Sequence, residues 1–223
     1  QVVIDGYTAP LTAGNFAKLV MDGAYNGAKL STINQAILSD NGVDKNSGYS
    51  VPLEIMPSGQ FEPLYKTTLS VQDGELPVLP LSVYGAVAMA HNEASDEYSS
   101  PYQFFFYLYD KRSAGLGGIS FDEGQFSVFG YTTTGRDILP QIKTGDIIRS
   151  AKLIEGQDRL VLPKEKISLG AAICGRPSGT WRGPCVSSSI CNSQCKEREG
   201  AEGGGCWYQS HVLQIFLYIF VTN

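Results

Sequence analysis

The first 163 residues contain no cysteine, and the five cysteines of the chain all follow them, at Cys174, Cys185, Cys191, Cys195 and Cys206. A domain over residues 1–163 therefore needs neither disulfides nor thiolate metal sites. Histidine is nearly as scarce, since only His91 and His211 occur, and no Gly-x-Ser-x-Gly motif accompanies His91. A Ser-His-Asp hydrolase is consequently a weak hypothesis.

Basic charge and long hydrophobic runs are also lacking. Residues 1–163 hold 11 Lys and Arg against 18 Asp and Glu, a net charge of −7, whereas residues 164–223 carry +2. An acidic body without a basic cluster argues against nucleic acid as a partner. The apolar run over 212–221 is shorter than the about 20 residues of a membrane-spanning helix. No phosphate-binding or dinucleotide motif occurs, so we predict no cofactor and no metal.

Three short β-prone runs, at 85–90, 102–109 and 125–130, organise the chain. In the middle run, two-residue periodicity places Gln103, Phe105 and two tyrosines on one face and three apolar residues on the other. The apolar face suits a core. The other face suits the floor of an apolar pocket with one hydrogen-bonding amide, although a strand buried on both faces fits this pattern equally well.

The flanking sequence predicts further strands and two helices. Residues 1–5 and 147–153 have strand character. An apolar helical period predicts a first helix that Thr12 caps and Gly23 ends, and a second helix over 136–143. Many short strands with two helices indicate a mainly β protein, either a barrel or a sandwich.

Residues 43–84 contain five prolines among short apolar runs. This composition predicts a long surface excursion with edge strands at 51–55 and 76–79. Residues 94–102 and 111–122 are predicted to be loops because they are rich in polar residues and in glycine, respectively.

The three organising runs resemble the signature blocks of cyclophilins, the cyclosporin-binding prolyl cis-trans isomerases. The matching blocks are Gly85-Ala-Val-Ala-Met-Ala90, Gln103-Phe104-Phe105 and Val128-Phe129-Gly130. The resemblance extends over residues 1–163. The segment Val51–Ile55, with the long insert after it, is similar to the divergent cyclophilins of the chloroplast thylakoid lumen.

This resemblance implies a closed eight-stranded antiparallel barrel with two capping helices. In the family, a further strand precedes the one at residues 1–5. The resemblance therefore predicts a barrel whose first strand is missing and one of whose strand edges is open. It also implies a location in the chloroplast thylakoid lumen, with any targeting segment upstream of residue 1.

The resemblance further assigns a proline cup and a backbone clamp to positions of this chain. Phe105 would form the cup with Leu38 and Phe126, and Gln103 would fix the substrate backbone. The remaining substrate-binding positions are Asp40, Ala90, His91, Asn92 and Phe121.

The catalytic arginine of the family is replaced, because Thr32 stands at its position. The plainer interpretation of this stretch is that Leu30, Ile33 and Ile37 are simply core residues. A neutral hydroxyl does not match a preorganised guanidinium, and losing one such donor typically costs about 3–4 kcal/mol. We therefore expect a monomeric prolyl isomerase of weak activity, acting on proline-containing segments of client proteins.

Two alternatives stay open. The first is a non-catalytic cyclophilin-like module that binds proline-containing segments of lumenal photosynthetic proteins. The second is a structural barrel whose groove is blocked by Phe121, Phe126 and the insert. Saturable peptide binding without faster isomerisation distinguishes the first, and absence of binding the second. Cyclosporin binding should be poor in every case.

Residues 164–223 resemble no part of the cyclophilin family, and their glycines, serines and cysteines show no sustained periodicity. We expect a non-homologous, poorly ordered end, as alternative splicing or a wrong reading frame would produce. The alternative is a zinc site, but its ligand spacing lacks the paired C-x2-C pattern. Its ligands would be Cys185, Cys191, Cys195, Cys206 and His211.

Overall fold

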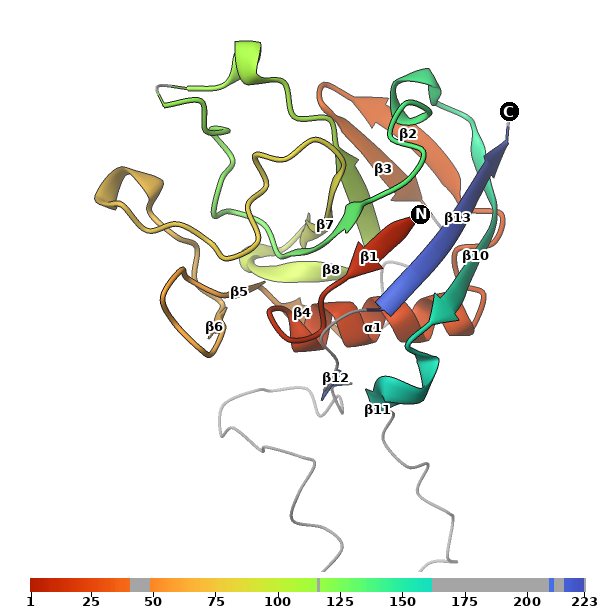
Figure 1. Cartoon of the computed structure of the whole chain (residues 1–223), viewed down its shortest axis with the longest axis horizontal. Coiled ribbons are helices and arrows are strands. Elements are labelled where there is room, and N and C mark those ends of the chain that lie inside the picture. The colour runs from red at the N-terminus through yellow and green to blue at the C-terminus, as the bar shows by residue number, and fades with distance from the viewer. Residues whose placement is uncertain (41–48, 116, 162–208, 211–214, 223) are drawn as a thin grey trace, which may run out of the picture.

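The computed structural model describes all residues except 41–48, 116, 162–208, 211–214 and 223 (Figure 1). Eight of its strands form a closed antiparallel barrel. They are β1 (Val2–Ile4), β2 (Lys29–Ile33), β3 (Ala36–Asp40), β7 (Ala86–Asn92), β8 (Ser95–Tyr107), β9 (Val128–Thr132), β10 (Ile147–Glu155) and β13 (Ile215–Thr222). Their order is β3-β2-β10-β13-β1-β9-β7-β8, and pairing of β8 with β3 closes the ring.

Shorter elements surround this barrel. The α-helix of the described residues is α1 (Pro10–Met21). The small strands are β4 (Val51–Pro52), which pairs with β8, β5 (Glu54–Ile55), which pairs with β6 (Leu64–Tyr65), and β11 (Leu160–Val161), which pairs with β12 (Gln209–Ser210). The 3-10 turns are η1 (Val71–Asp73), η2 (Lys111–Ser113), η3 (Leu139–Gln141) and η4 (Gln157–Arg159).

The aromatic side chains of β8 alternate between the barrel core and its outer surface, as the sequence predicts. Phe104 and Phe106 belong to the main core, whereas Phe105 and Tyr107 belong to a separate apolar cluster. Helix α1 inserts Phe16 into the main core, where its ring lies 5.1 Å from the ring of Phe104. The helix therefore covers one end of the barrel, below the strands in Figure 1.

Both helix predictions need correction. Helix α1 begins at Pro10, so Thr12 lies inside it and is not its cap. The second predicted helix, over 136–143, is reduced to the 3-10 turn η3, which contains Pro140. Proline has no N–H to continue a helical ladder and is tolerated only near a helix start.

Two loop and strand boundaries also differ from the prediction. The predicted loop 94–102 is mostly strand, because β8 begins at Ser95 and pairs with β7 through two register shifts. The predicted strand at 76–79 is absent from the described residues, where a single bridge joins Pro57 to Pro77. The predicted edge strand at 51–55 is present as β4 and β5.

The barrel has no open edge between β1 and β10, because β13 lies between them and pairs with both. The expectation of an open strand edge is therefore wrong, because β13 fills that place. For Ile215–Thr222, the expectation of poor order is also wrong, since these residues form a strand and Leu217 is fully buried. The strand that closes the barrel thus comes from residues 215–222, far along the chain from β1.

Candidate functional site

A row of directly opposed residues crosses the outer surface of the barrel. Ser31 on β2 opposes Leu38 on β3, and Leu38 opposes Phe105 on β8. Phe105 in turn opposes Ala88 on β7. Opposed residues in a ladder point to the same face, so these four side chains share the outer face.

The three residues predicted to form a proline cup lie together on this face. Phe105 is 5% exposed in the outer apolar cluster, and Leu38, Ala90 and Phe126 pack against that cluster. The rings of Phe105 and Phe126 lie 5.2 Å apart, edge to face. The structure therefore brings together Phe105, Leu38 and Phe126, although the burial of Phe105 leaves little of its ring open to a ligand.

The long excursion packs against the same face. Leu81 is buried in the outer cluster. The buried carboxylate of Glu123 accepts hydrogen bonds from the backbone N–H groups of Leu81 and Ser82, each 2.7 Å long. This contact fastens the end of the excursion to the loop that precedes Phe126.

The ring of Phe126 contacts His91 as well as Phe105. The His91 ring lies 4.3 Å from the ring of Phe126. Its Nδ1 lies 2.9 Å from a carboxylate oxygen of Asp96, and its Nε2 lies 2.7 Å from the carbonyl oxygen of Gln125. Both partners are acceptors, so a neutral imidazole with one N–H donates to one of them at a time.

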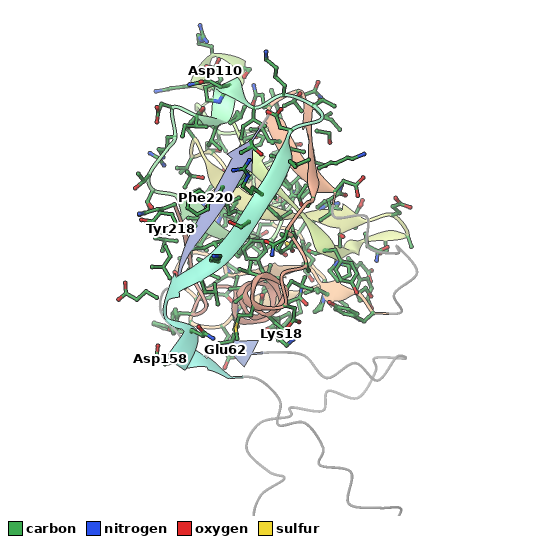
Figure 2. The ribbon with its side chains drawn as sticks, turned by 90° about the vertical axis from the view of Figure 1, so that its right-hand side faces the viewer. Lys18, Glu62, Asp110, Asp158, Tyr218 and Phe220 are labelled. Carbon is green, nitrogen blue, oxygen red and sulfur yellow. The ribbon has the colours of Figure 1, made fainter. Side chains whose placement is uncertain are left out.

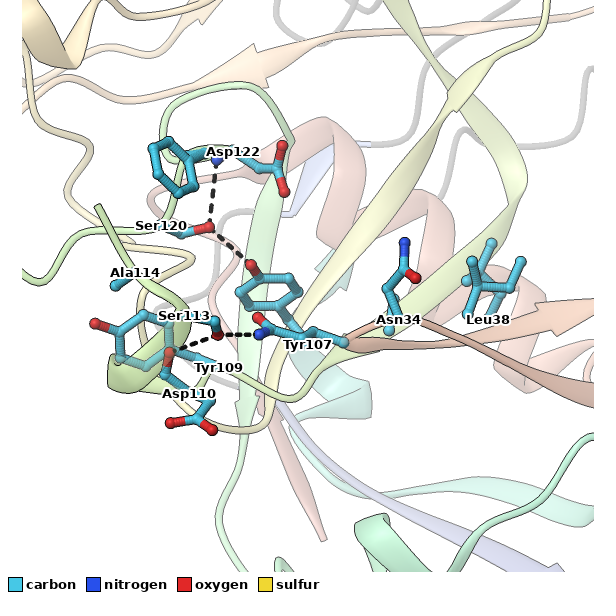
Figure 3. A pocket seen from close by; sticks show the side chains of 13 residues that line it. Asn34, Leu38, Tyr107, Tyr109, Asp110, Ser113, Ala114, Ser120 and Asp122 are labelled. Atoms are coloured by element: carbon cyan, nitrogen blue, oxygen red, sulfur yellow. Dashed lines mark hydrogen bonds between the residues drawn. The ribbon is translucent and has the colours of Figure 1, made fainter.

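A cavity of about 420 Å³ lies next to this cup, further along the same face of β8 (Figure 3). It is lined by Ile33, Asn34, Gln35, Ala36, Leu38, Tyr107, Tyr109, Asp110, Ser113, Ala114, Ser120, Phe121 and Asp122. Leu38 is thus the shared wall between cup and cavity. Of the predicted site residues, the cavity reaches Leu38 and Phe121 but not Gln103, Phe105 or Phe126.

The polar groups around the cavity are engaged with one another. The hydroxyl of Tyr107 shares a 2.7 Å hydrogen bond with that of Ser120, which accepts from the N–H of Asp122 (Figure 3). Burial raises the pKa of Tyr107, against the opposing effect of the Ser120 bond. The Arg112 guanidinium, 2.8 Å from Asp110, lowers the pKa of that carboxyl. The lining itself includes neither Lys nor Arg.

Thr32 lies off the face of the cup. It opposes Ile37, which is buried in the main core, and it follows Leu30 by two residues on the same side of β2. Its N–H donates to the hydroxyl of Thr144 at 3.0 Å, and the two hydroxyls lie 2.9 Å apart. The residue of β2 that does share the face of Phe105 is Ser31, which sequence reasoning missed. Two-residue alternation from the apolar Leu30 was the signal that would have found it.

The core interpretation of this stretch is correct for two of its three residues. Leu30 and Ile37 are buried in the main core. Ile33 is 54% exposed and lines the cavity instead. Its place on the outer side of β2 follows from the same alternation that places Ser31 there.

The remaining predicted site residues are half-buried or exposed. Gln103 is half-buried two residues before Phe105, and its N–H donates to the hydroxyl of Ser100 at 3.0 Å. Ala90, His91 and Asn92 are half-buried at the end of β7. Asp40 is exposed opposite Lys29, and Phe121 is 82% exposed.

An eight-stranded antiparallel barrel with a helix over one end and an aromatic cup beside a surface cavity defines a cyclophilin-like barrel. Residues 1–161 match the family described as cyclophilin type peptidyl-prolyl cis-trans isomerase/CLD. The chain belongs to this family, as its three signature runs predict.

The chain is similar to chloroplast and thylakoid members of the family. It is 80% identical over 163 residues to the chloroplastic peptidyl-prolyl cis-trans isomerase CYP37 of Arabidopsis thaliana, covering 73% of this chain and 35% of that protein. It is 36% identical over 173 residues to sll0408 of Synechocystis, named as a thylakoid lumen peptidyl-prolyl cis-trans isomerase, covering 72% of this chain and 45% of that protein. The chain therefore spans less than half the length of these two relatives.

Among solved structures, cyclophilin AquaCyp293 from Hirschia baltica aligns with a TM-score of 0.40 and 17% identity, over 65% of this chain and 68% of that one.

A second family matches residues that come after the first family's match in the sequence. Residues 172–212 match the Gamma-thionin family. Defensin-like protein 1 of Heuchera sanguinea is 52% identical over 48 residues, which cover 21% of this chain and 89% of that protein. The match supplies a family for a stretch that the sequence analysis related to none. The chain thus joins a cyclophilin segment to a gamma-thionin segment.

Within the described residues, no helix has the length and apolar character that crossing a membrane requires. In the same part of the chain, no three His, Cys, Asp or Glu side chains gather as metal ligands would. The zinc alternative, with His211 and four cysteines, lies outside the described residues.

Proposed function

We propose that residues 1–161, together with the closing strand β13, form a prolyl isomerase domain of weak activity that binds X-Pro segments on the outer face of the barrel. The observation that carries this proposal is the row from Ser31 through Leu38 to Phe105 beside the cavity. It offers apolar surface for a proline ring but no guanidinium.

Catalysis of this reaction requires more than binding. The barrier to amide rotation is about 18–20 kcal/mol, which reflects lost resonance. A catalyst must hold the proline ring and donate a hydrogen bond to the nitrogen as it becomes pyramidal. Ser31 is the neutral hydroxyl nearest in register to the cup, and neutral hydrogen bonds contribute about 0.5–1.5 kcal/mol against about 1.5–3 for charged ones. Binding should therefore be retained more fully than turnover.

A non-catalytic binding module is the second candidate, favoured by the same lack of a cation along the cavity lining. Its ligands would be proline-containing segments of photosynthetic proteins in the thylakoid lumen. The names of the two relatives refer to the chloroplast and the thylakoid lumen, and they support the same compartment for this chain. A monomer that needs no cofactor suffices for either candidate.

The deciding experiment measures binding and turnover with the full chain and one proline-containing peptide. Isotope-labelled peptide reports binding by titration and cis-trans exchange by NMR. Saturable binding, with exchange accelerated about two to three orders of magnitude less than by an arginine-bearing cyclophilin, supports the weak isomerase. Binding without acceleration supports the binding module. Full acceleration contradicts the loss-of-donor argument, and absence of binding indicates a blocked groove.

A further inference from the structure

The closing strand β13 is held by backbone pairing on both sides. It pairs with β1 from Val2↔Leu217 to Ile4↔Ile215. It pairs with β10 from Ile147↔Thr222 to Glu155↔Phe216, with two register shifts. Figure 1 shows β13 beside β10, with the short strand β1 on its other side. Most of its pairing is therefore with β10.

The side chains of β13 alternate as a closing strand requires. Leu217 is fully buried in the main core, and Ile219 and Val221 pack against that core. Tyr218 and Phe220 point the other way, with their rings 5.8 Å apart and Phe220 53% exposed (Figure 2). The side-chain amide of Gln1 donates to the hydroxyl of Tyr218. The segment is therefore held in the slot between β1 and β10 by its side chains as well as by backbone pairing.

Removing β13 would leave two unpaired strand edges facing one another. Val2 to Ile4 on one side and Ile147 to Glu155 on the other would lose their ladder partners. Such paired open edges are templates for an added strand. The core would also lose the side chain of Leu217, whose removal leaves a cavity.

Strand β13 is far in the sequence from the preceding strands of the barrel. Val161 ends β11 and Ile215 begins β13, and the residues that match the Gamma-thionin family, 172–212, lie between them. In this intervening stretch, β12 pairs with β11. Strand β12 lies inside the matching residues, and β11 and β13 flank those residues in the sequence. No short turn joins β13 to β1 or to β10. Its place in the barrel therefore depends on strand pairing and side-chain packing.

We propose that the slot between β1 and β10 is a strand-binding site. Its ligand is the segment Ile215–Thr222, an extended strand with aliphatic residues at alternate positions. The slot recognises this segment by backbone pairing and by its inward side chains, so that the same segment binds when supplied as a separate peptide. The barrel thereby fastens the far end of the gamma-thionin segment to itself.

The test uses the full chain with Ile219→Pro, because proline is poorly tolerated inside a paired strand, and with the milder Leu217→Ala. Phe220→Ser is the matched control, since that side chain is exposed. We expect the melting temperature to fall by about 5–15 °C in L217A and further in I219P, and to change by less than about 2 °C in F220S. A synthetic peptide of residues 213–222 should restore the melting temperature of I219P and should bind to it saturably.

A peptide carrying the same Ile219→Pro change serves as the negative control and should restore nothing. Unchanged melting in both L217A and I219P would overturn the proposal, because the slot would then gain nothing from its strand. Destabilisation without rescue would overturn it too, because the strand would then depend on its connection to the chain. If I219P does not fold alone, L217A with the wild-type peptide gives the same comparison.

Discussion

The carboxylate of Glu54 accepts a 2.8 Å hydrogen bond from the backbone N–H of Thr12 and, through its other oxygen, a 3.1 Å bond from Leu11. Glu54 is 1% exposed and belongs to β5, in the long excursion. The first turn of α1 is thus capped from another part of the chain, because Ala9 offers no side-chain cap. The excursion therefore stabilises the helix that fills the barrel end.

Replacing Glu54 by alanine should destabilise the protein. The substitution leaves two N–H groups of the first helical turn without their acceptor, and each buried donor left unpaired costs about 1–3 kcal/mol. Urea unfolding measures the difference. Glu62→Ala, an exposed carboxylate of the same excursion, should change the unfolding free energy by less than about 0.5 kcal/mol. Equal effects of the two substitutions would contradict a capping role.

The same carboxyl should make stability depend on pH. Burial raises the pKa of Glu54, against the opposing hydrogen bonds from Thr12 and Leu11. A raised folded pKa gives a stabilising contribution that is complete below the unfolded pKa, about 4.3, and is lost as pH rises through the folded value. Glu54→Gln removes this titration. The unfolding free energy of wild type minus that of E54Q should therefore fall between pH 4 and pH 7; a constant or growing difference would contradict this assignment.

Because Gly130 has no side chain, the backbones of β1 and β9 can lie close together at this position. Gly130 opposes Ile4, and a Cβ at residue 130 would overlap the carbonyl oxygen of Val3 and lie 3.1 Å from the Cα of Ile4. Gly130→Ala should therefore push β1 away and destabilise by about 1–3 kcal/mol. Hydrogen exchange of the β1 amides should accelerate. Gly59→Ala, which has open space around it and only a left-handed φ of +83°, should leave β1 exchange unchanged.

Periodicity in the sequence predicted the features that depend on neighbouring residues alone. Alternation along β8 separated Phe104 from Phe105 because successive residues of any strand point to opposite faces. The glutamate cap of α1 could not be predicted in this way, since Glu54 lies 42 residues from Thr12. Closure by β13 was also hidden, because no short-range signal says which edge a distant apolar run will join.

The candidate site shows the same division. Resemblance and alternation together assembled Leu38, Phe105 and Phe126, and the structure places them in contact with one cluster. The position of Thr32 was taken from the family pattern alone, without its register. In the β2–β3 ladder, Thr32 opposes Ile37 and points to the core side. Ser31 opposes Leu38 and points to the outer face. Register, and not residue order, decides which hydroxyl faces the cup.

Phe126 should contribute to peptide affinity. Its ring meets Phe105 edge to face at 5.2 Å, and such aromatic pairs contribute about 0.5–1.5 kcal/mol beyond their burial. Phe126→Ala should weaken binding of a proline-containing peptide by about three- to tenfold in an NMR or calorimetric titration. Phe61→Ala, an exposed aromatic of the excursion, is the control and should leave the affinity unchanged. Similar losses in both variants would show that the cup is elsewhere.

The register of β2 decides which of its residues can present a cation to the cup. Ser31 shares the outer face with Leu38 and Phe105, whereas Thr32 lies on the core side and bonds Thr144. An arginine at residue 31 can therefore present its guanidinium over the cup, and an arginine at residue 32 starts from the wrong side of β2. Ser31→Arg should raise the isomerisation rate of a bound prolyl peptide by about a hundred- to a thousandfold, the range for one preorganised donor.

Thr32→Arg is the matched control, because it adds the same charge one residue away. Its rate should stay within about threefold of wild type, and Ser31→Lys should recover less than Ser31→Arg, since an ammonium is a point charge without the planar fork. Exchange NMR at saturating peptide separates these rate changes from changes in affinity. If T32R is faster than S31R, the register argument is wrong, because the donor then reaches the cup from residue 32.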